Sequence, residues 1–270
     1  MQNQPARNPR ILVVANQKGG VGKTTTAINL GTALAAVGAP TLVVDIDPQG
    51  NASTGLGIPQ SARKLTIYDV LVGEARLADA IVPTKIPGLS IIPSTVELSG
   101  AELELIELSR RNFRLKDAFA QFAENPSQPF SYVLIDCPPS LTLLTVNAMA
   151  AADAVVVPLQ CEFFALEGLS QLLKTIERVR ANLNPALDIQ GIVLTMFDKR
   201  NKLSDQVAAD VRAHMGDKVY RTVIPRNVRI SEAPSHGLPA LVYDLRCPGS
   251  QAYIKLAGEI IQREKLRVAA

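Results

Sequence analysis

The stretch that decides the fold reads Ile11-Leu12-Val13-Val14-Ala15-Asn16-Gln17-Lys18-Gly19-Gly20-Val21-Gly22-Lys23-Thr24-Thr25-Thr26. It begins with an apolar, β-branched run, passes through glycines, and continues from Thr24 with apolar residues at helical spacing. A strand, a glycine-rich turn and a helix in this order aim backbone N–H groups and the positive end of the helix at one point. Glycine lets the backbone wrap closely around an anion there. The stretch therefore predicts a polyphosphate-binding loop.

The end of this loop carries the side chains expected to contact a nucleotide. Lys23 is expected to pair with the β- and γ-phosphates, and the Thr24 hydroxyl is expected to hold Mg²⁺, as in the ending G-K-[ST]. The strict pattern has glycine at position 17, where this chain has Gln17, and a second lysine, Lys18, follows directly. The residues expected to bind the nucleotide through this loop are Lys18, Gly19, Gly20, Val21, Gly22, Lys23, Thr24 and Thr25.

Working outward, short apolar runs alternate with segments of helical periodicity. The runs lie at residues 11–15, 42–46, 89–92, 132–135, 154–157 and 192–194. The helical segments lie at residues 24–37, 142–151, 167–180, 203–215 and 250–263. Because the runs do not alternate with polar residues, both faces of the sheet are expected to be covered. The pattern predicts an α/β fold: a doubly wound, mostly parallel sheet flanked by helices.

The domain organisation follows from the same reading. Residues 60–130 follow the alternation of apolar runs and helical segments less closely. We expect them to form two helices that cover an edge of the sheet, without forming a separate domain. Glycine, proline and serine never cluster into a linker. We therefore expect residues 1–9 to form a flexible N-terminal arm and residues 10–270 to form one domain of the P-loop NTPase type.

Composition sets limits on compartment and partners. Lys and Arg total 28 against 25 Asp and Glu, a balance of +3 that is too mild to predict nucleic-acid binding from net charge. The three cysteines have neither a disulfide framework nor zinc-ligand spacing, which favours a cytoplasmic location. The longest uncharged stretch, residues 24–44, contains Asn, Gly and Pro, so no membrane span is expected.

Acidic side chains follow two of the apolar runs. Asp45 and Asp47 end the second run, and Asp136 ends the run at 132–135. Because ligands of open α/β sheets bind at the carboxyl ends of strands, these carboxylates are expected to return to the phosphate end. A carboxylate after four apolar residues is also the arrangement that holds Mg²⁺ directly or through water in P-loop NTPases. Asp136 is therefore a predicted metal ligand.

Three motifs together resemble the ParA/MinD family of ATPases: K-G-G-x-G-K-[ST] at residues 18–24, known as a deviant Walker A loop, D-x-D-P-Q-G-N at 45–51 and D-C-P-P-S at 136–140. The resemblance implies ATP and Mg²⁺ as cofactors. It implies that Asp47 helps to position the attacking water, that Asp45 supports the metal site with Thr24, and that Asp136 belongs to a second switch. Lys18, by the same resemblance, reaches across a nucleotide-sandwich homodimer to the partner's phosphates. Lys18, Lys23 and Asp47 are thus the expected catalytic residues.

The segments at residues 194–200 and 223–237 are similar to the chromosome-partitioning ParA/Soj branch of this family, and the likeness runs from Arg10 to the C-terminal end. It implies that Pro225 and Asn227 lie against the nucleotide base and that Arg200 and Arg229 contact DNA. It further implies an ATP-bound dimer that binds double-stranded DNA non-specifically, at the nucleoid. A ParB-type centromere-binding partner would stimulate hydrolysis and so segregate a chromosome or a plasmid. Chromosomal or plasmid origin stays open.

Other classes of protein contain the same loop, and they are the alternative functions for this chain. A MinD-like membrane-associated cell-division ATPase would need a basic amphipathic tail, but the segment at residues 253–266 has mixed charge and no Trp or Phe. An electron carrier resembling the nitrogenase iron protein would need two cysteines in suitable contexts, and only Cys137 neighbours a switch. A small-molecule ligase would need a carboxylate-substrate pocket that no motif marks. We therefore expect no membrane partner.

Overall fold

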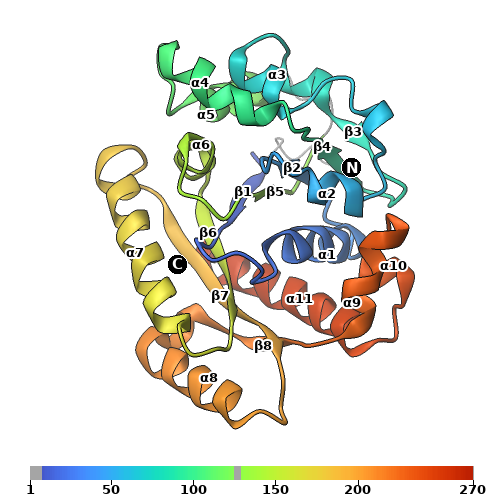
Figure 1. Ribbon diagram of the computed structural model, residues 1–270, viewed down its shortest axis with the longest axis vertical. Helices are drawn as coiled ribbons and strands as arrows, with labels where there is room; N and C mark the ends of the chain where they lie inside the picture. Colours follow the sequence, from blue (N-terminus) through green and yellow to red (C-terminus); the bar gives the residue numbers. More distant parts are fainter. Residues whose placement is uncertain (1–7, 125–128, 270) are drawn as a thin grey trace.

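An eight-stranded sheet lies at the centre of the computed structural model, which describes residues 8–124 and 129–269 (Figure 1). The strand order is β3-β4-β2-β5-β1-β6-β7-β8, and every pair is parallel except β3 with β4. The expected doubly wound, mostly parallel sheet is thus confirmed. Residues 1–7 of the expected N-terminal arm lie outside the described part of the chain.

The regular elements have the following bounds. The strands are β1 (Arg10–Val14), β2 (Thr41–Asp45), β3 (Val82–Pro83), β4 (Leu89–Ile92), β5 (Tyr132–Asp136), β6 (Ala154–Gln160), β7 (Asp188–Phe197) and β8 (Val219–Pro225). The α-helices are α1 (Lys23–Ala36), α2 (Asn51–Gly55), α3 (Ile67–Val72), α4 (Leu98–Glu107), α5 (Arg114–Glu124), α6 (Leu143–Ala151), α7 (Ala165–Asn182), α8 (Lys202–Met215), α9 (Val228–Glu232), α10 (Ala240–Tyr243) and α11 (Pro248–Ala269). Short 3₁₀ turns are η1 (Gln60–Ala62), η2 (Leu77–Ala80), η3 (Gly216–Lys218) and η4 (Ala233–His236).

Helices cover both faces of the sheet because successive strand residues point to opposite sides. Leu12 and Val14 belong to a core with α1 and α11, whereas Val13 belongs to a core with α3 to α8. Strands buried on both faces read as continuous apolar runs, which is why periodicity predicted six of them. The two helices expected at residues 60–130 are α4 and α5, and α5 packs against α6.

Strand β8 was not anticipated from the sequence. Its residues Arg221 and Thr222 are polar and partly exposed, so the run lacks the apolar continuity of the other strands. It lies at the edge of the sheet, where unpaired backbone N–H groups would invite pairing with another chain. The Glu259 carboxylate of α11 accepts from the N–H groups of Arg221 at 2.9 Å and Thr222 at 3.1 Å. This contact protects the edge.

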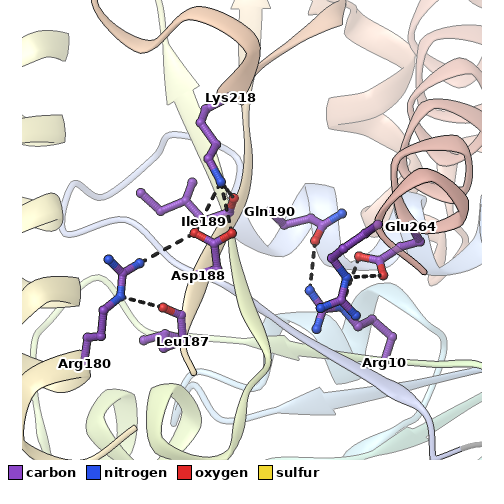
Figure 2. Close-up of polar contacts among 9 residues, drawn as sticks. Arg10, Arg180, Leu187, Asp188, Ile189, Gln190, Lys218 and Glu264 are labelled. Atoms are coloured by element: carbon purple, nitrogen blue, oxygen red, sulfur yellow. Dashed lines mark hydrogen bonds and ion pairs between the residues drawn. The ribbon is translucent and has the colours of Figure 1, made fainter. Parts of the chain in front are cut away.

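The amino ends of the strands are closed by contacts among polar side chains (Figure 2). Arg10, the first residue of β1, contacts Glu264 of α11 at 3.0 Å and donates to Gln190 of β7 at 3.2 Å. Asp188, the first residue of β7, pairs with Lys218 at 3.0 Å. The polar groups at this end therefore find partners within the chain, whereas ligands of open α/β sheets bind at the carboxyl ends of the strands.

Candidate functional site

The phosphate loop joins β1, a central strand of the sheet, to α1. Asn16 fixes its start: the side-chain amide donates to the Pro158 carbonyl at 2.7 Å, and the amide oxygen accepts from the Lys18 N–H at 3.1 Å. The loop's other end is held where the Thr195 hydroxyl of β7 donates to the Val21 carbonyl at 2.8 Å. Contacts from β6 and β7 thus hold the loop in shape before any ligand arrives.

The start of α1 is open to an anion. Gly22 precedes the helix with φ 88°, in the left-handed region that favours glycine, and no side chain caps the helix. The first N–H groups of a helix have no partner within the helix. A phosphate at this helix end would satisfy them and meet the positive end of the helix dipole.

The two loop lysines differ in their surroundings. Lys23 is buried, and its Nζ donates to the Lys18 carbonyl at 3.0 Å. Burial lowers the pKa of Lys23, opposed by the nearby carboxylates of Asp136 and Asp47. The Lys18 side chain is 41% exposed and forms an ion pair with Glu162, which follows β6. Lys23 is therefore fixed inside the loop, whereas Lys18 lies at its rim.

Asp45, at the end of β2, is enclosed by donors from its own chain. Its carboxylate accepts from the N–H and the hydroxyl of Ser53 at 2.8 and 2.7 Å, and from the Asp47 N–H at 3.3 Å. Burial nonetheless raises the pKa of Asp45 to about 6. The structure therefore gives this side chain a positioning contact to α2, and its predicted support of a metal would act through that segment.

Asp47 lies two residues beyond, at the start of the turn into α2. The side chain is 7% exposed, and its carboxylate accepts from the Gln49 N–H at 2.9 Å. Its charge acts on both Lys23 and Asp136, so the three side chains lie at the same site. The prediction that the carboxylates return to the phosphate end agrees with this geometry.

Asp136, at the end of β5, lies opposite Asp45 in the register of the two strands. Both of its carboxylate oxygens are buried and neither has a hydrogen-bond partner within the described residues. Burial, followed by the charge of Asp45, raises the pKa of Asp136 well above its ordinary value, while the adjacent Thr24 hydroxyl and Lys23 lower it. Burying an unsatisfied carboxylate is costly unless a cation or donor meets it.

These groups fit a magnesium ion bound together with a nucleotide. The orphaned oxygens of Asp136 beside the Thr24 hydroxyl are hard oxygen donors, which Mg²⁺ prefers. In residues 8–124 and 129–269 no group of three or more His, Cys, Asp and Glu side chains is arranged to hold a metal. A bound Mg²⁺ would therefore take its remaining ligands from phosphate oxygens and water, as is usual for this ion.

Sequence reasoning missed the hydrogen bonds that hold the segment after Asp47. The buried guanidinium of Arg63 donates to the carbonyls of Ile58 and Ser94 and to the Thr54 hydroxyl. The Ser94 N–H, beyond the end of β4, donates to the Ser53 hydroxyl at 3.0 Å. No motif marks Arg63, because its partners are distant in sequence; a lone arginine in a small-residue segment was the only signal.

The residues expected to lie against the nucleotide base, and those expected to contact DNA, lie at the ends of the last two strands of the sheet or follow them. Pro225 ends β8 beside Phe197, and Asn227 caps α9 by accepting from the Arg229 N–H at 3.0 Å. The side chains of Arg200 and Arg229 are 87% and 52% exposed. Each pairs with acids of its own segment: Arg200 with Asp198, and Arg229 with Glu232 and Asp244. Their predicted roles stay predictions.

A basic cleft of about 790 Å³ extends from Arg200 along β8 to α11. Its cationic lining residues are Lys199, Arg200, Arg221, Arg226 and Lys255, against a single acid, Asp198. None of its lining residues belongs to the phosphate loop. The sequence could not reveal this concentration of charge, because the basic residues come from strand β8, helix α11 and the segments that follow β7 and β8.

Strand, phosphate loop and helix, with buried carboxylates at the ends of the neighbouring strands, define a P-loop NTPase with a deviant Walker A loop. A family model described as AAA domain matches residues 9–189. The chain is 67% identical over 263 residues to the chromosome partitioning protein ParA of Caulobacter vibrioides, a match covering 97% of this chain and 98% of that protein. It is 52% identical over 251 residues to the sporulation initiation inhibitor protein Soj of Bacillus subtilis, covering 93% and 98%. The chain belongs to the ParA/Soj family of chromosome-partitioning ATPases.

Solved structures agree with this class. A cobyrinic acid a,c-diamide synthase from Mycobacterium smegmatis, with bound ATP analog and magnesium, superposes with a TM-score of 0.82 at 36% identity, covering 95% of this chain and 96% of that one. The cell division ATPase MinD of Pyrococcus furiosus superposes with a TM-score of 0.77 at 29% identity, covering 94% and 98%. The predictions of family, fold class, ATPase activity and the cofactors ATP and Mg²⁺ are confirmed.

Proposed function

We propose that this partitioning ATPase is a DNA-binding switch whose ATP-bound homodimer binds duplex DNA non-specifically and is released by hydrolysis. A ParB-type centromere-binding partner stimulates that hydrolysis, and the protein acts at the nucleoid. The observation that carries the proposal is that two lysines of one loop differ in exposure. Lys23 lies inside the loop, and Lys18 lies exposed at its rim. A lysine at the rim can exchange its ion pair with Glu162 for a phosphate held by a second copy, which would link dimerisation to catalysis.

Residues of the phosphate loop and of the strand ends have distinct roles in this scheme. Bound Mg²⁺ supplies charge neutralisation to the phosphates. Lys23 holds the terminal phosphates, and Thr24 and Asp136 hold the ion from the protein side. Asp47 orients the attacking water from a carboxylate that already faces Lys23. Asp45 keeps the turn that carries Asp47 in place through Ser53.

The number of arginines that can contact DNA doubles on dimerisation, and this doubling controls the affinity for DNA. Arg200 and Arg229 are the proposed DNA contacts, so a dimer presents four such arginines and a monomer two. Each neutralised phosphate contributes about −0.9 to the slope of log affinity against log salt. Raising salt from about 50 to 200 mM would therefore weaken a four-phosphate complex about 10²-fold and a two-phosphate complex about tenfold. Both arginines are exposed, and exposed ion pairs contribute little, so their intramolecular acids do not prevent exchange for phosphates.

The C-terminal helix supports DNA over a membrane as the surface that is bound. In α11, Tyr253, Leu256, Ala257 and Ile260 are buried in the core with α1. Its apolar face is thus engaged and cannot lie on a bilayer without leaving the sheet. In the described part of the chain, no helix combines the length and apolar character needed to cross a membrane.

The experiment measures duplex-DNA binding against salt with no nucleotide, ADP, ATP and a slowly hydrolysed ATP analogue. We expect strong binding only with ATP or the analogue, and a steeper salt slope for that state. Arg200→Glu with Arg229→Glu should abolish this binding while nucleotide-dependent dimerisation, followed by light scattering, persists.

Two controls complete the design. Arg76→Glu with Arg110→Glu removes two exposed arginines that also pair with nearby aspartates, and this variant should bind DNA as the parent does. Lys18→Ala should retain ATP but lose both the dimer and DNA binding. Equal DNA affinity in the empty, ADP and ATP states would refute the proposed switch.

A further inference from the structure

Helix α4 exposes an apolar stripe that the fold does not use. Its inner face, formed by Leu98, Ala101 and Leu105, is fully buried. On the outside, Leu103 is 74% exposed and Ile106 is 54% exposed. Residues three and four apart lie on one side of a helix, so these two side chains are neighbours. Figure 1 shows α4 at an outer end of the molecule, and it packs beside α3.

The stripe continues beyond the start of the helix. Val96 is 69% exposed and lies seven residues before Leu103, which is two helical turns. The helical hydrogen bonding already includes it, because the Ser99 N–H donates to the Val96 carbonyl at 3.0 Å. We call Val96, Leu103 and Ile106 the α4 stripe. Contiguous exposed apolar side chains rimmed by polar residues mark interaction sites.

Acidic side chains surround the α4 stripe. The helix and its N-cap carry four glutamates and no basic residue: Glu97, Glu102, Glu104 and Glu107. Within the described residues none of the four forms an ion pair, and one buried oxygen of Glu102 has no hydrogen-bond partner. The stripe is thus apolar in its middle and negative around it.

The arginines that follow α4 bind groups other than its glutamates. Arg110 pairs with Asp117 at 2.7 Å, and Arg114 donates to the carbonyls of Leu71 and Val72. Arg111 donates to the Ile106 carbonyl at 3.3 Å and so stays at the end of the helix. None of these three arginines pairs with a glutamate of α4, and Glu104 accepts a neutral hydrogen bond from the Tyr68 hydroxyl at 2.9 Å, so the negative charge of the helix is left to an external cation.

This charge decides which occupant fits. DNA and an anionic lipid surface would be repelled by the glutamates, and a second copy would bring the same negative stripe against itself. A positively charged segment with apolar side chains complements both features. Apolar anchors at helical spacing are the usual way in which an amphipathic helix occupies such a surface.

The position of α4 connects the stripe to the nucleotide site. Its first turn follows Ser94, whose N–H donates to the Ser53 hydroxyl and whose carbonyl accepts from Arg63 at 2.8 Å. Ser53 in turn holds Asp45. A partner bound to α4 would therefore contact a helix that begins shortly after Ser94, which is hydrogen-bonded to the segment that follows Asp47.

We propose that the α4 stripe is the docking surface for a short cationic amphipathic segment of a partner protein. The identity of that partner as the one that stimulates hydrolysis rests on the proposed function; the binding itself does not. Leu103 and Ile106 supply the apolar contacts, and Glu104 and Glu107 pair with the partner's lysines or arginines.

The test uses the full chain and a fluorescein-labelled peptide built of lysine and leucine, with the leucines at helical spacing. Fluorescence anisotropy should detect saturable binding that weakens as salt rises. Leu103→Ser with Ile106→Ser should weaken it at least about tenfold, and so should Glu104→Gln with Glu107→Gln. A peptide with glutamate in place of lysine should not bind.

Matched control variants remove similar side chains elsewhere. Val242→Ser with Leu245→Ser changes two apolar residues that are 53% and 54% exposed, and Asp205→Asn with Asp210→Asn changes two exposed acids on α8. Both should bind the peptide as the parent does. Absence of binding to the parent, or equal losses in stripe and control variants, would overturn the proposal.

ATP-dependent DNA binding of the same variants separates the two proposals. It should be unchanged in the stripe variants, because neither Arg200 nor the phosphate loop is altered. If DNA binding fails in the parent while peptide binding follows the stripe, the switch is refuted and the docking surface stands.

Discussion

Asp45 and Asp136 end neighbouring parallel strands and lie opposite each other in register, and both are fully buried. Asp45 accepts hydrogen bonds from Ser53 and Asp47, whereas Asp136 accepts none from the described residues. Strand position and burial are thus the same, and the donors differ. A buried carboxyl group with its own donors holds a turn of the fold in place, while one without them is held ready for a group from outside the chain.

The largest effect is expected at the cation that faces Asp136. Lys23→Ala removes the one buried lysine of the loop and leaves the phosphates without their charge partner. ATP affinity should fall at least about 10²-fold, and hydrolysis should be lost with it. Titration with a fluorescent ATP analogue measures this. Lys174→Ala, an exposed lysine on α7, is the control, and parent-like affinity in Lys23→Ala would contradict the assignment.

Asp136→Asn tests the unpartnered side of the comparison. Magnesium-dependent hydrolysis should fall about 10²- to 10³-fold, because the ion loses its carboxylate. The free energy of unfolding without nucleotide should stay equal or rise, since the substitution removes a buried carboxyl group whose charged form is disfavoured by burial and whose oxygens accept no hydrogen bond. Phosphate release and urea denaturation measure the two quantities. A destabilised variant would mean that Asp136 has a structural partner after all.

Asp47→Ala should separate binding from chemistry. Hydrolysis should decrease about 10²-fold as the water loses its orienting group, while ATP stays bound. Incubation with ATP, followed by chromatography of the retained nucleotide, should therefore recover ATP from the variant and ADP from the parent. Hydrolysis at the parent rate would rule out the proposed role.

Asp45→Ala tests the partnered side, and its effect should be on stability. The substitution leaves the N–H and hydroxyl of Ser53 without their acceptor, which costs about 1–3 kcal/mol of unfolding free energy. Urea denaturation should therefore shift in the direction opposite to Asp136→Asn. A change of the same sign and size in both variants would remove the distinction between the two carboxylates.

The smallest effect is a pH dependence. The pKa of Asp45 is about 6 in the folded chain against an ordinary 3.8, so the folded state binds more protons between these values. The corresponding stability is fully present below pH 3.8 and is lost as pH rises through about 6. Relative to Asp45→Asn, the parent should therefore lose stability between pH 4 and 7. A constant difference across this range would contradict the raised pKa.

Several features could be predicted because their signal is local. The glycines and lysines of residues 16–24 specify the phosphate loop, and uninterrupted apolar runs specify strands buried on both faces. Helix α11 was expected at residues 250–263 and extends over Pro248–Ala269. Strand β8 was missed because an edge strand carries polar residues.

Other features depend on groups that meet only after folding. The ion pair of Lys18 with Glu162 and the contacts of Arg63 join residues far apart in the chain. The basic cleft is lined by Lys199, Arg221 and Lys255, which come from three separate parts of the chain. No single segment of the sequence contains all the residues of any of these contacts, so the contacts could not be inferred from residue spacing.

The sequence by itself determined the class of chemistry: a loop of fixed composition between a strand and a helix, followed by carboxylates at strand ends, binds a nucleotide and its ion. Tertiary structure alone decided how those carboxylates differ. Ser53 reaches Asp45 because α2 folds back on β2, whereas Asp136 has the Thr24 hydroxyl beside it but accepts no hydrogen bond from the described chain. The physical reason is that motifs encode which groups are present, while hydrogen-bond partners depend on where distant segments pack.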